Sequence, residues 1–177
     1  QDDQVPLGYS NFPEIIFGLS FGTEYKGFGL SILFQGADHM SRYASARMYR
    51  PFNTDGSVAQ YIIDNSWTPE RYANGENIEF PHLSAGGVQV YDYQPSSWWI
   101  QNSRYVRLKN VEISYDFRGN LLKRMNMSSA RVYVNGHNLI TWDNLWPGDD
   151  PEQFTNQGDN GYYPLTRTVN LGLNVSF

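Results

Sequence analysis

The chain has 177 residues, of which 16% are aromatic and 18% charged, with 16 glycines, no cysteine and a net charge of −5. The lack of cysteine excludes disulfides, thiolate metal sites and cysteine nucleophiles, and a negative charge without a basic run excludes nucleic-acid binding. No run of roughly 18 apolar residues is present, which excludes a membrane-spanning helix, while the aromatic content favours β structure.

The first predicted elements are two long strands joined by a tight turn. Apolar and small or polar residues alternate over 14–25 and again over 28–36. A period of two is typical of a strand with one apolar and one wet face. Lys26 and Gly27, between the two runs, suit a two-residue hairpin turn. We therefore predict a hairpin.

The alternation is lost over 37–103, where Tyr, Asn, Gly, Pro and Trp are frequent and one short helical turn is predicted at 58–63. Irregular connections longer than about 12–15 residues are uncommon in compact domains, and they usually form lids or binding surfaces. We interpret this segment as an extracellular loop and not as a second domain.

Three further strands are predicted, at 104–117, 129–140 and 165–177, with a second loop at 141–164. The apolar phase changes within the first of them, which predicts a β-bulge near 109–110. Strands of soluble domains usually have about 5–6 residues, whereas a tilted strand needs roughly 9–11 to cross a bilayer. The last strand is therefore long enough to span a membrane.

Short and long connections alternate along the chain, so the short turns meet at one end of the sheet. Aromatic residues gather at this end and predict an interfacial girdle; they are Tyr25, Phe28, Tyr115, Phe117 and Phe177. The opposite faces of the strands carry polar residues that would line a lumen, such as Ser20, Glu24, Gln35, Asn170 and Asn174.

Five strands cannot close a membrane barrel, because the open edges would leave backbone groups unpaired in lipid. The predicted fold class is therefore an all-β, antiparallel transmembrane barrel to which this chain contributes about five strands. The chain opens on Gln1 without a Met, a basic region or an apolar leader. We expect a mature fragment or a C-terminal piece, with the missing strands before Gln1.

Several segments resemble one family, the SusC/RagA-type TonB-dependent transporters of the Bacteroidota outer membrane. Residues 3–18 resemble its DRVPIGYSNPPEIIYG stretch, with Gln4 and Phe12 departing, and residues 97–111 resemble the run that ends in SYLRLKNV. Further similar segments are 132–139, a strand ending in NL, 163–168 before the terminal strand, and 67–70, which begins the WTPENP loop. At 71–72, Arg and Tyr replace the Asn and Pro of that last motif.

This resemblance implies a plugged barrel of about 22 strands, of which the chain supplies the last five. It implies a SusD-type surface lipoprotein as a lid and energy from the TonB complex, which would act on an N-terminal part absent here. Phe177 would be the terminal aromatic that the outer-membrane assembly machinery reads. Asp150-Pro151-Glu152 recurs in the family, which implies a loop-shaping role.

Candidate contact residues lie in the long loops. Stacking faces for a glycan, or anchors for a lid protein, are offered by Trp67, Tyr91, Tyr93, Trp98 and Trp99. Packing within the loops, or a place in the outer aromatic girdle, is the alternative role of these rings, and we favour it because aromatic-rich loops must bury something to stay folded.

Other polar residues give weaker signals for chemistry. An acidic group, Asp143, Asp149, Asp150 and Glu152, could bind calcium through its oxygens, although a solvated loop is favoured because the order of ligands found in EF-hands is absent. His39, His82 and His137 are scattered without metal-ligand spacing. We predict no enzyme activity and no cofactor other than this calcium.

The sequence thus predicts nutrient uptake across the cell outer membrane, with a glycan or a peptide as cargo and lipid around the barrel. Two alternatives remain. A secreted carbohydrate-binding β-sandwich would bury the apolar faces on a second sheet and use the tryptophans as a sugar platform. A barrel enzyme would need a Ser/His or similar pair at the lipid boundary, and the sequence offers none.

Overall fold

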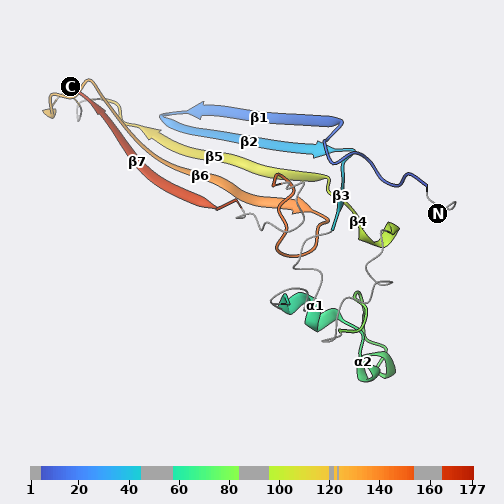
Figure 1. Cartoon of the computed structure of the whole chain (residues 1–177). Coiled ribbons are helices and arrows are strands. Elements are labelled where there is room, and N and C mark those ends of the chain that lie inside the picture. The colour runs from blue at the N-terminus through green and yellow to red at the C-terminus, as the bar shows by residue number, and fades with distance from the viewer. Residues whose placement is uncertain (1–4, 45–57, 84–95, 120–121, 123, 154–164) are drawn as a thin grey trace.

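The computed structural model describes residues 5–44, 58–83, 96–119, 122, 124–153 and 165–177. Its main feature is one antiparallel sheet with the strand order β1-β2-β5-β6-β7, which forms a long curved ribbon (Figure 1). The strands are β1 (Ile15–Tyr25), β2 (Phe28–Asp38), β5 (Tyr105–Asp116), β6 (Ser129–Asp143) and β7 (Thr168–Ser176). The all-β, antiparallel class predicted from the sequence is confirmed.

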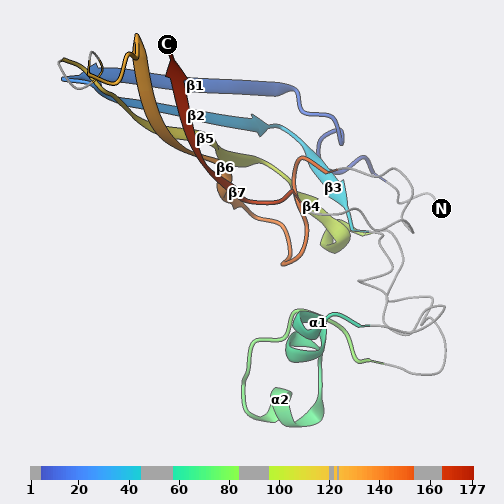
Figure 2. The same ribbon diagram turned by 90° about the vertical axis from the view of Figure 1, so that its left-hand side faces the viewer.

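The sheet has two distinct ends. The turn between β1 and β2 lies at the same end as the C-terminus of β7, and helices α1 (Gln60–Asn65) and α2 (Pro69–Ala73) lie beyond the other end (Figures 1 and 2). We call these the turn end and the loop end. Neither helix in the described ranges has the length and hydropathy needed to cross a membrane.

The turn between β1 and β2 follows from its two residues. Lys26 has a φ of 50° and Gly27 a φ of 93°, so both central positions are left-handed, as a type I′ turn requires. Tyr25 pairs with Phe28 directly beside the turn, and the register continues unbroken to the pairing of Ile15 with Asp38. The Lys26-Gly27 signal therefore fixes the register of the whole hairpin.

Gly27→Ala is expected to weaken this turn for two reasons. The left-handed conformation alone costs a residue with a Cβ about 1–2 kcal/mol, and the new Cβ would lie 2.8 Å from the Asp116 carbonyl oxygen. Gly119→Ala is the matched control, because its φ of 94° is nearly the same but no atom of the described residues lies within 4 Å of its Cβ position. Unfolding free energies from urea titrations in lipid vesicles should show the larger loss for Gly27→Ala, and equal losses would contradict the steric contribution.

A β-bulge interrupts β5 where the sequence predicts one. Leu108 pairs with Phe34 and Asn110 with Leu33, so Lys109 has no partner on β2. On the other side Leu108 pairs with Ile140 and Asn110 with His137, so the register shifts there as well. The extra residue keeps apolar side chains on one face before and after the irregularity.

The two faces of the sheet differ in polarity, because residues paired across strands lie on the same face. One face carries exposed apolar side chains on every strand; among them are Leu19, Phe21, Phe28, Ile113, Val134, Val169, Leu171 and Leu173. The other face carries polar side chains and includes all five residues predicted to face a lumen, Ser20, Glu24, Gln35, Asn170 and Asn174. Its pairs include Asn170 with Asn135, joined by a 2.9 Å amide hydrogen bond.

Some element boundaries differ from the prediction. β6 runs three residues further, to Asp143, because Trp142 and Asp143 still pair with β5. β7 begins at Thr168 and not at 165, because the Leu165 N–H donates to Asp150 Oδ2 and the Thr166 carbonyl accepts from Asn138 Nδ2. These backbone groups are therefore used by a loop and a side chain instead of the ladder.

The segment 37–103 contains more regular structure than predicted. β2 continues to Asp38, and β3 (Ser41–Tyr43) and β4 (Ile100–Asn102) form a two-stranded sheet. The 3-10 turn η2 (Ser97–Trp99) directly precedes β4. Helix α1 overlaps the predicted helical turn at 58–63. A buried apolar cluster lies in this region and not on the sheet; its members are Ala44, Ile62, Phe80 and Trp99.

Candidate functional site

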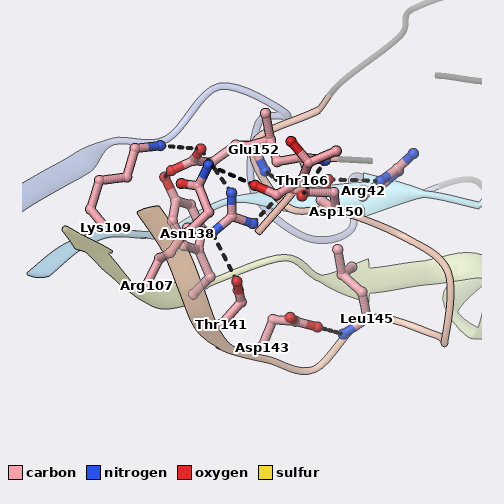
Figure 3. A network of polar contacts seen from close by, with 12 residues as sticks. Arg42, Arg107, Lys109, Asn138, Thr141, Asp143, Leu145, Asp150, Glu152 and Thr166 are labelled. Carbon is pink, nitrogen blue, oxygen red and sulfur yellow. Dashed lines mark hydrogen bonds and ion pairs between the residues drawn. The ribbon is translucent and has the colours of Figure 1, made fainter. Parts of the chain in front are cut away.

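A network of charged side chains joins the loop end of the sheet to the acidic loop, residues 144–153 (Figure 3). At its centre is Arg107 of β5, whose side chain is only 2% exposed. Its Nε donates to Thr141 Oγ1 at 2.8 Å, its Nη2 to Asp150 Oδ1 at 2.8 Å and its Nη1 to Glu152 Oε2 at 3.0 Å. The planar guanidinium thus binds one strand and two loop carboxylates at once.

Two more cations complete this network. Lys109 Nζ lies 2.6 Å from Glu152 Oε2, the same carboxylate oxygen that Arg107 contacts. Arg42 of β3 lies 3.4 Å from Asp149 through Nη2 and Oδ1, and both side chains are largely buried. We call Arg42, Arg107, Lys109, Asp149, Asp150 and Glu152 the loop-end network. Its three positive and three negative groups balance.

The structure thus places three of the four predicted calcium ligands in ion pairs. Asp143 lines the same pocket as Arg107, Asp149 and Asp150, and its Oδ1 accepts the Leu145 N–H at 3.0 Å. Within the described residues, no group of three or more His, Cys, Asp or Glu side chains is arranged to hold a metal ion. The geometry favours loop shaping for Asp150 and Glu152, and calcium binding stays a prediction.

The predicted aromatic contact residues separate into buried and exposed ones. Trp99 is 2% exposed and belongs to the buried cluster, whereas its neighbour Trp98 is 41% exposed. The Trp98 ring lies 5.1 Å from that of Trp146 and 5.5 Å from that of Phe80, measured between centroids. Tyr91 and Tyr93 lie outside the described residues. Trp98 therefore remains available for a contact, and Trp99 serves packing.

Trp67 is 37% exposed and lines a shallow groove of about 400 Å³ together with Arg71, His82, Glu70 and Glu76. Helix α2 begins here: Thr68 caps it by accepting the Arg71 N–H, and Pro69 occupies its first turn. Arg71 Nη1 donates to the carbonyls of Ile63 and Ser66, which ties α2 to α1. The groove is thus held by a folded scaffold.

Tyr61 of α1 donates a hydrogen bond to Glu79, which links the helix to the chain beyond α2. This hydrogen bond raises the pKa of Tyr61 to about 12, with smaller contributions from burial and from the negative charge of Glu79. Tyr61 is therefore protonated at neutral pH and serves as a donor.

The predicted girdle residues gather at the turn end. The rings of Phe28 and Tyr115 lie 4.6 Å apart, and those of Tyr115 and Phe117 lie 5.1 Å apart in an edge-to-face arrangement. Tyr25 pairs with Phe28, and Phe177 follows the end of β7 as an exposed residue. The structure brings the first four together; the role as a girdle stays a prediction.

The three histidines lie in different parts of the structure: His39 just after β2, His82 beyond α2 and His137 within β6. The His39 ring stacks on Tyr9 at 4.7 Å and its Nδ1 lies 3.3 Å from Glu14. The His82 ring lies 6.0 Å from that of Trp67, and His137 pairs with Asn110 and Thr168 within the sheet. This scatter agrees with surface and strand roles.

Two curated relatives of this chain carry the same description. TonB-dependent receptor P26 of Formosa agariphila is 32% identical over 99% of this chain, and TonB-dependent receptor P3 of the same organism is 29% identical over 93%. The chain spans only 18% and 16% of these two relatives. No protein-family model matches the chain.

The fold agrees with this result. The RagAB peptide importer in its open-open state matches 96% of this chain with a TM-score of 0.68 and 25% identity, over 18% of its own chain. The chain matches a segment of the SusC/RagA-type TonB-dependent receptors. These are outer-membrane proteins, which confirms the location predicted from the strands. The names of these relatives describe receptors and importers, which is consistent with the prediction of no enzyme activity.

Sequence reasoning missed the cations that hold the acidic loop. Arg107 and Lys109 lie in the motif shared with the SusC/RagA type, and Asp150 and Glu152 lie in a second motif 43 residues further along the chain. The sequence carried one signal of this contact: the charged residues of the first motif are positive and those of the second are negative. Arg42 precedes them in a region without alternation, so no pattern indicated it.

Proposed function

We propose that this chain forms part of the wall and of the outer loops of a TonB-dependent importer of the outer membrane. The observation that carries this proposal is the polarity of the sheet. Every strand exposes apolar side chains on one face and polar ones on the other. In a membrane barrel the first face contacts lipid and the second lines a hydrated interior. The aromatic residues at the turn end would then lie at the periplasmic interface.

The loop end supplies the surfaces that would meet cargo and partner. Trp67 and Trp98 are exposed on the folded loops and could stack on a sugar ring or anchor a lid protein. The expected partner is a SusD-type surface lipoprotein, and the expected cargo is an oligosaccharide or a peptide. The name of the RagAB importer refers to peptides, which supports the peptide of these two. Energy would come from the TonB complex, and Phe177 would mark the barrel for assembly.

A β-sandwich lectin is less well supported. It requires a second sheet over the apolar face of the first, and within the described ranges the other sheet is the small β3–β4 pair. The large exposed side chains of β7 and β1 would then remain in water. The wall of a membrane barrel explains this exposure directly.

Uptake by cells tests the proposed function. Cells that carry the complete importer should accumulate fluorescently labelled oligosaccharides or peptides, and they should lose this uptake when the TonB complex is deleted. The double variant Trp67→Ala/Trp98→Ala should reduce uptake while the importer stays at normal levels in the membrane, because both rings are exposed. Uptake that persists without TonB, or a chain that is monomeric in buffer without detergent, would contradict the proposal.

A further inference from the structure

The loop-end network connects the acidic loop to the sheet through several charged side chains. Arg107 is nearly fully buried and uses three of its nitrogens on Thr141, Asp150 and Glu152. A buried guanidinium in this geometry is held by several charge-assisted hydrogen bonds at once. Releasing the loop requires both ion pairs of Arg107 and its charge-assisted hydrogen bonds to be broken together. Partial opening is therefore costly.

The acidic loop makes further hydrogen bonds near both of its ends. The Trp146 N–H donates to Gln101 Oε1 at 3.2 Å, which links the loop to β4. At the far end, Asp150 Oδ2 accepts the Leu165 N–H at 3.4 Å. Inside the loop, Asp150 Oδ1 accepts the Glu152 N–H at 2.9 Å and so orients the second carboxylate. Four strands, β3, β4, β5 and β6, thus contact the loop.

The similarity to the importer does not depend on its state. The TM-score is 0.68 against the open-open state and 0.69 against the closed-closed state, with 96% and 97% of this chain covered. The fold of this segment is thus matched equally well by both states.

From these observations we infer that Arg107 and Lys109 are positioning residues that hold the acidic loop in one place on the rim of the importer throughout transport. The loop is then a fixed part of the rim, and any movement that admits cargo must occur elsewhere. This inference rests on the proposed import function. The ion pairs between the two charged motifs, RLK at 107–109 and DPE at 150–152, together hold the loop against the sheet.

Chemical cross-linking separates a fixed rim from a moving gate. In the complete importer, Lys109→Cys/Glu152→Cys removes two ion pairs, Lys109 with Glu152 and Arg107 with Glu152, and leaves that of Arg107 with Asp150. A short bifunctional thiol reagent can then join the two positions. This chain contributes no cysteine of its own to compete for the reagent. The control pair is Asn135→Cys/Asn170→Cys, which faces the same side and joins two strands that are already paired.

Two readouts are needed. Before cross-linking, hydrogen exchange in 144–153 should rise by at least about tenfold relative to the unaltered importer, since local opening becomes cheaper, and uptake should fall. After cross-linking, both should return toward their original values, while the control pair changes neither. Glu152→Gln, which keeps the side-chain volume, is the second variant if the double variant does not reach the membrane, and it should also raise exchange and lower uptake.

Uptake that is blocked by the cross-link, or exchange that is unaffected by losing the ion pairs, would overturn the inference. Failure of the proposed function gives a different result. In that case the unaltered importer takes up no cargo at all, while hydrogen exchange still reports whether the network holds the loop.

Discussion

Replacing Arg107 by methionine is expected to destabilise the folded protein by about 3–5 kcal/mol, because a buried pair that loses one partner leaves an uncompensated charge. Asp150 and Glu152 would both keep their negative charge next to an apolar side chain that cannot donate. Urea titrations of the importer in lipid vesicles measure the change in unfolding free energy. The loss should appear together with faster proteolysis within residues 144–153.

Two further variants separate charge from packing. Lys109→Met should cost much less, about 1 kcal/mol or below, because this side chain is 30% exposed and Glu152 keeps its contact with Arg107. The triple variant Arg107→Met/Asp150→Leu/Glu152→Leu should regain part of the loss, since no charge is then left buried alone. A triple variant less stable than Arg107→Met would show that packing and hydrogen bonds within the loop matter more than charge compensation.

Leu171→Arg on β7 is expected to impair insertion by about 2–4 kcal/mol if the residue lies near the bilayer midplane. Leu171 is 77% exposed on the apolar face, where it pairs with Val134. An arginine at this position would place its charge in the hydrocarbon core or require water to penetrate the bilayer around it. The measurement is the free energy of folding into vesicles, accompanied by the amount of importer in the outer membrane of cells.

Asn170→Arg is the matched control for this substitution. Asn170 is the preceding residue of the same strand and lies on the polar face beside Asn135. Because this face is hydrated in a barrel, the added charge should cost little. Leu173→Arg and Asn174→Arg form a second such pair on the same strand. If the substitutions on the two faces were equally harmful, the assignment of one face to lipid would be wrong.

The strands of the sheet could be predicted because a single physical rule governs them. One face meets lipid or another apolar medium and the other meets water, so polarity alternates with the pleat. The rule also located the bulge, since the phase of the apolar residues changes around Lys109. It failed at 165–167, where residues with the right alternation bond to Asp150 and Asn138 instead of the ladder.

The site could be predicted only in part. Composition indicated that the loops carry aromatic contact residues, but the adjacent Trp98 and Trp99 look equivalent in sequence, and only the fold shows that one is exposed and the other buried. The acidic loop was recognised as shaping the structure, whereas its partners were not. Ion pairs between residues 43 or more positions apart leave no local periodicity, and chain topology alone brings them together.

The sheet described above has β1 and β7 as its flanking strands. Each flank presents a row of backbone donors and acceptors to which no other described strand is attached. Copies of this polypeptide produced by themselves could therefore add to one another, flank to flank, and grow into fibrous ribbons or turbid aggregates. Biophysical measurements on this segment are best made within a closed barrel, where both edge strands are paired with neighbouring strands.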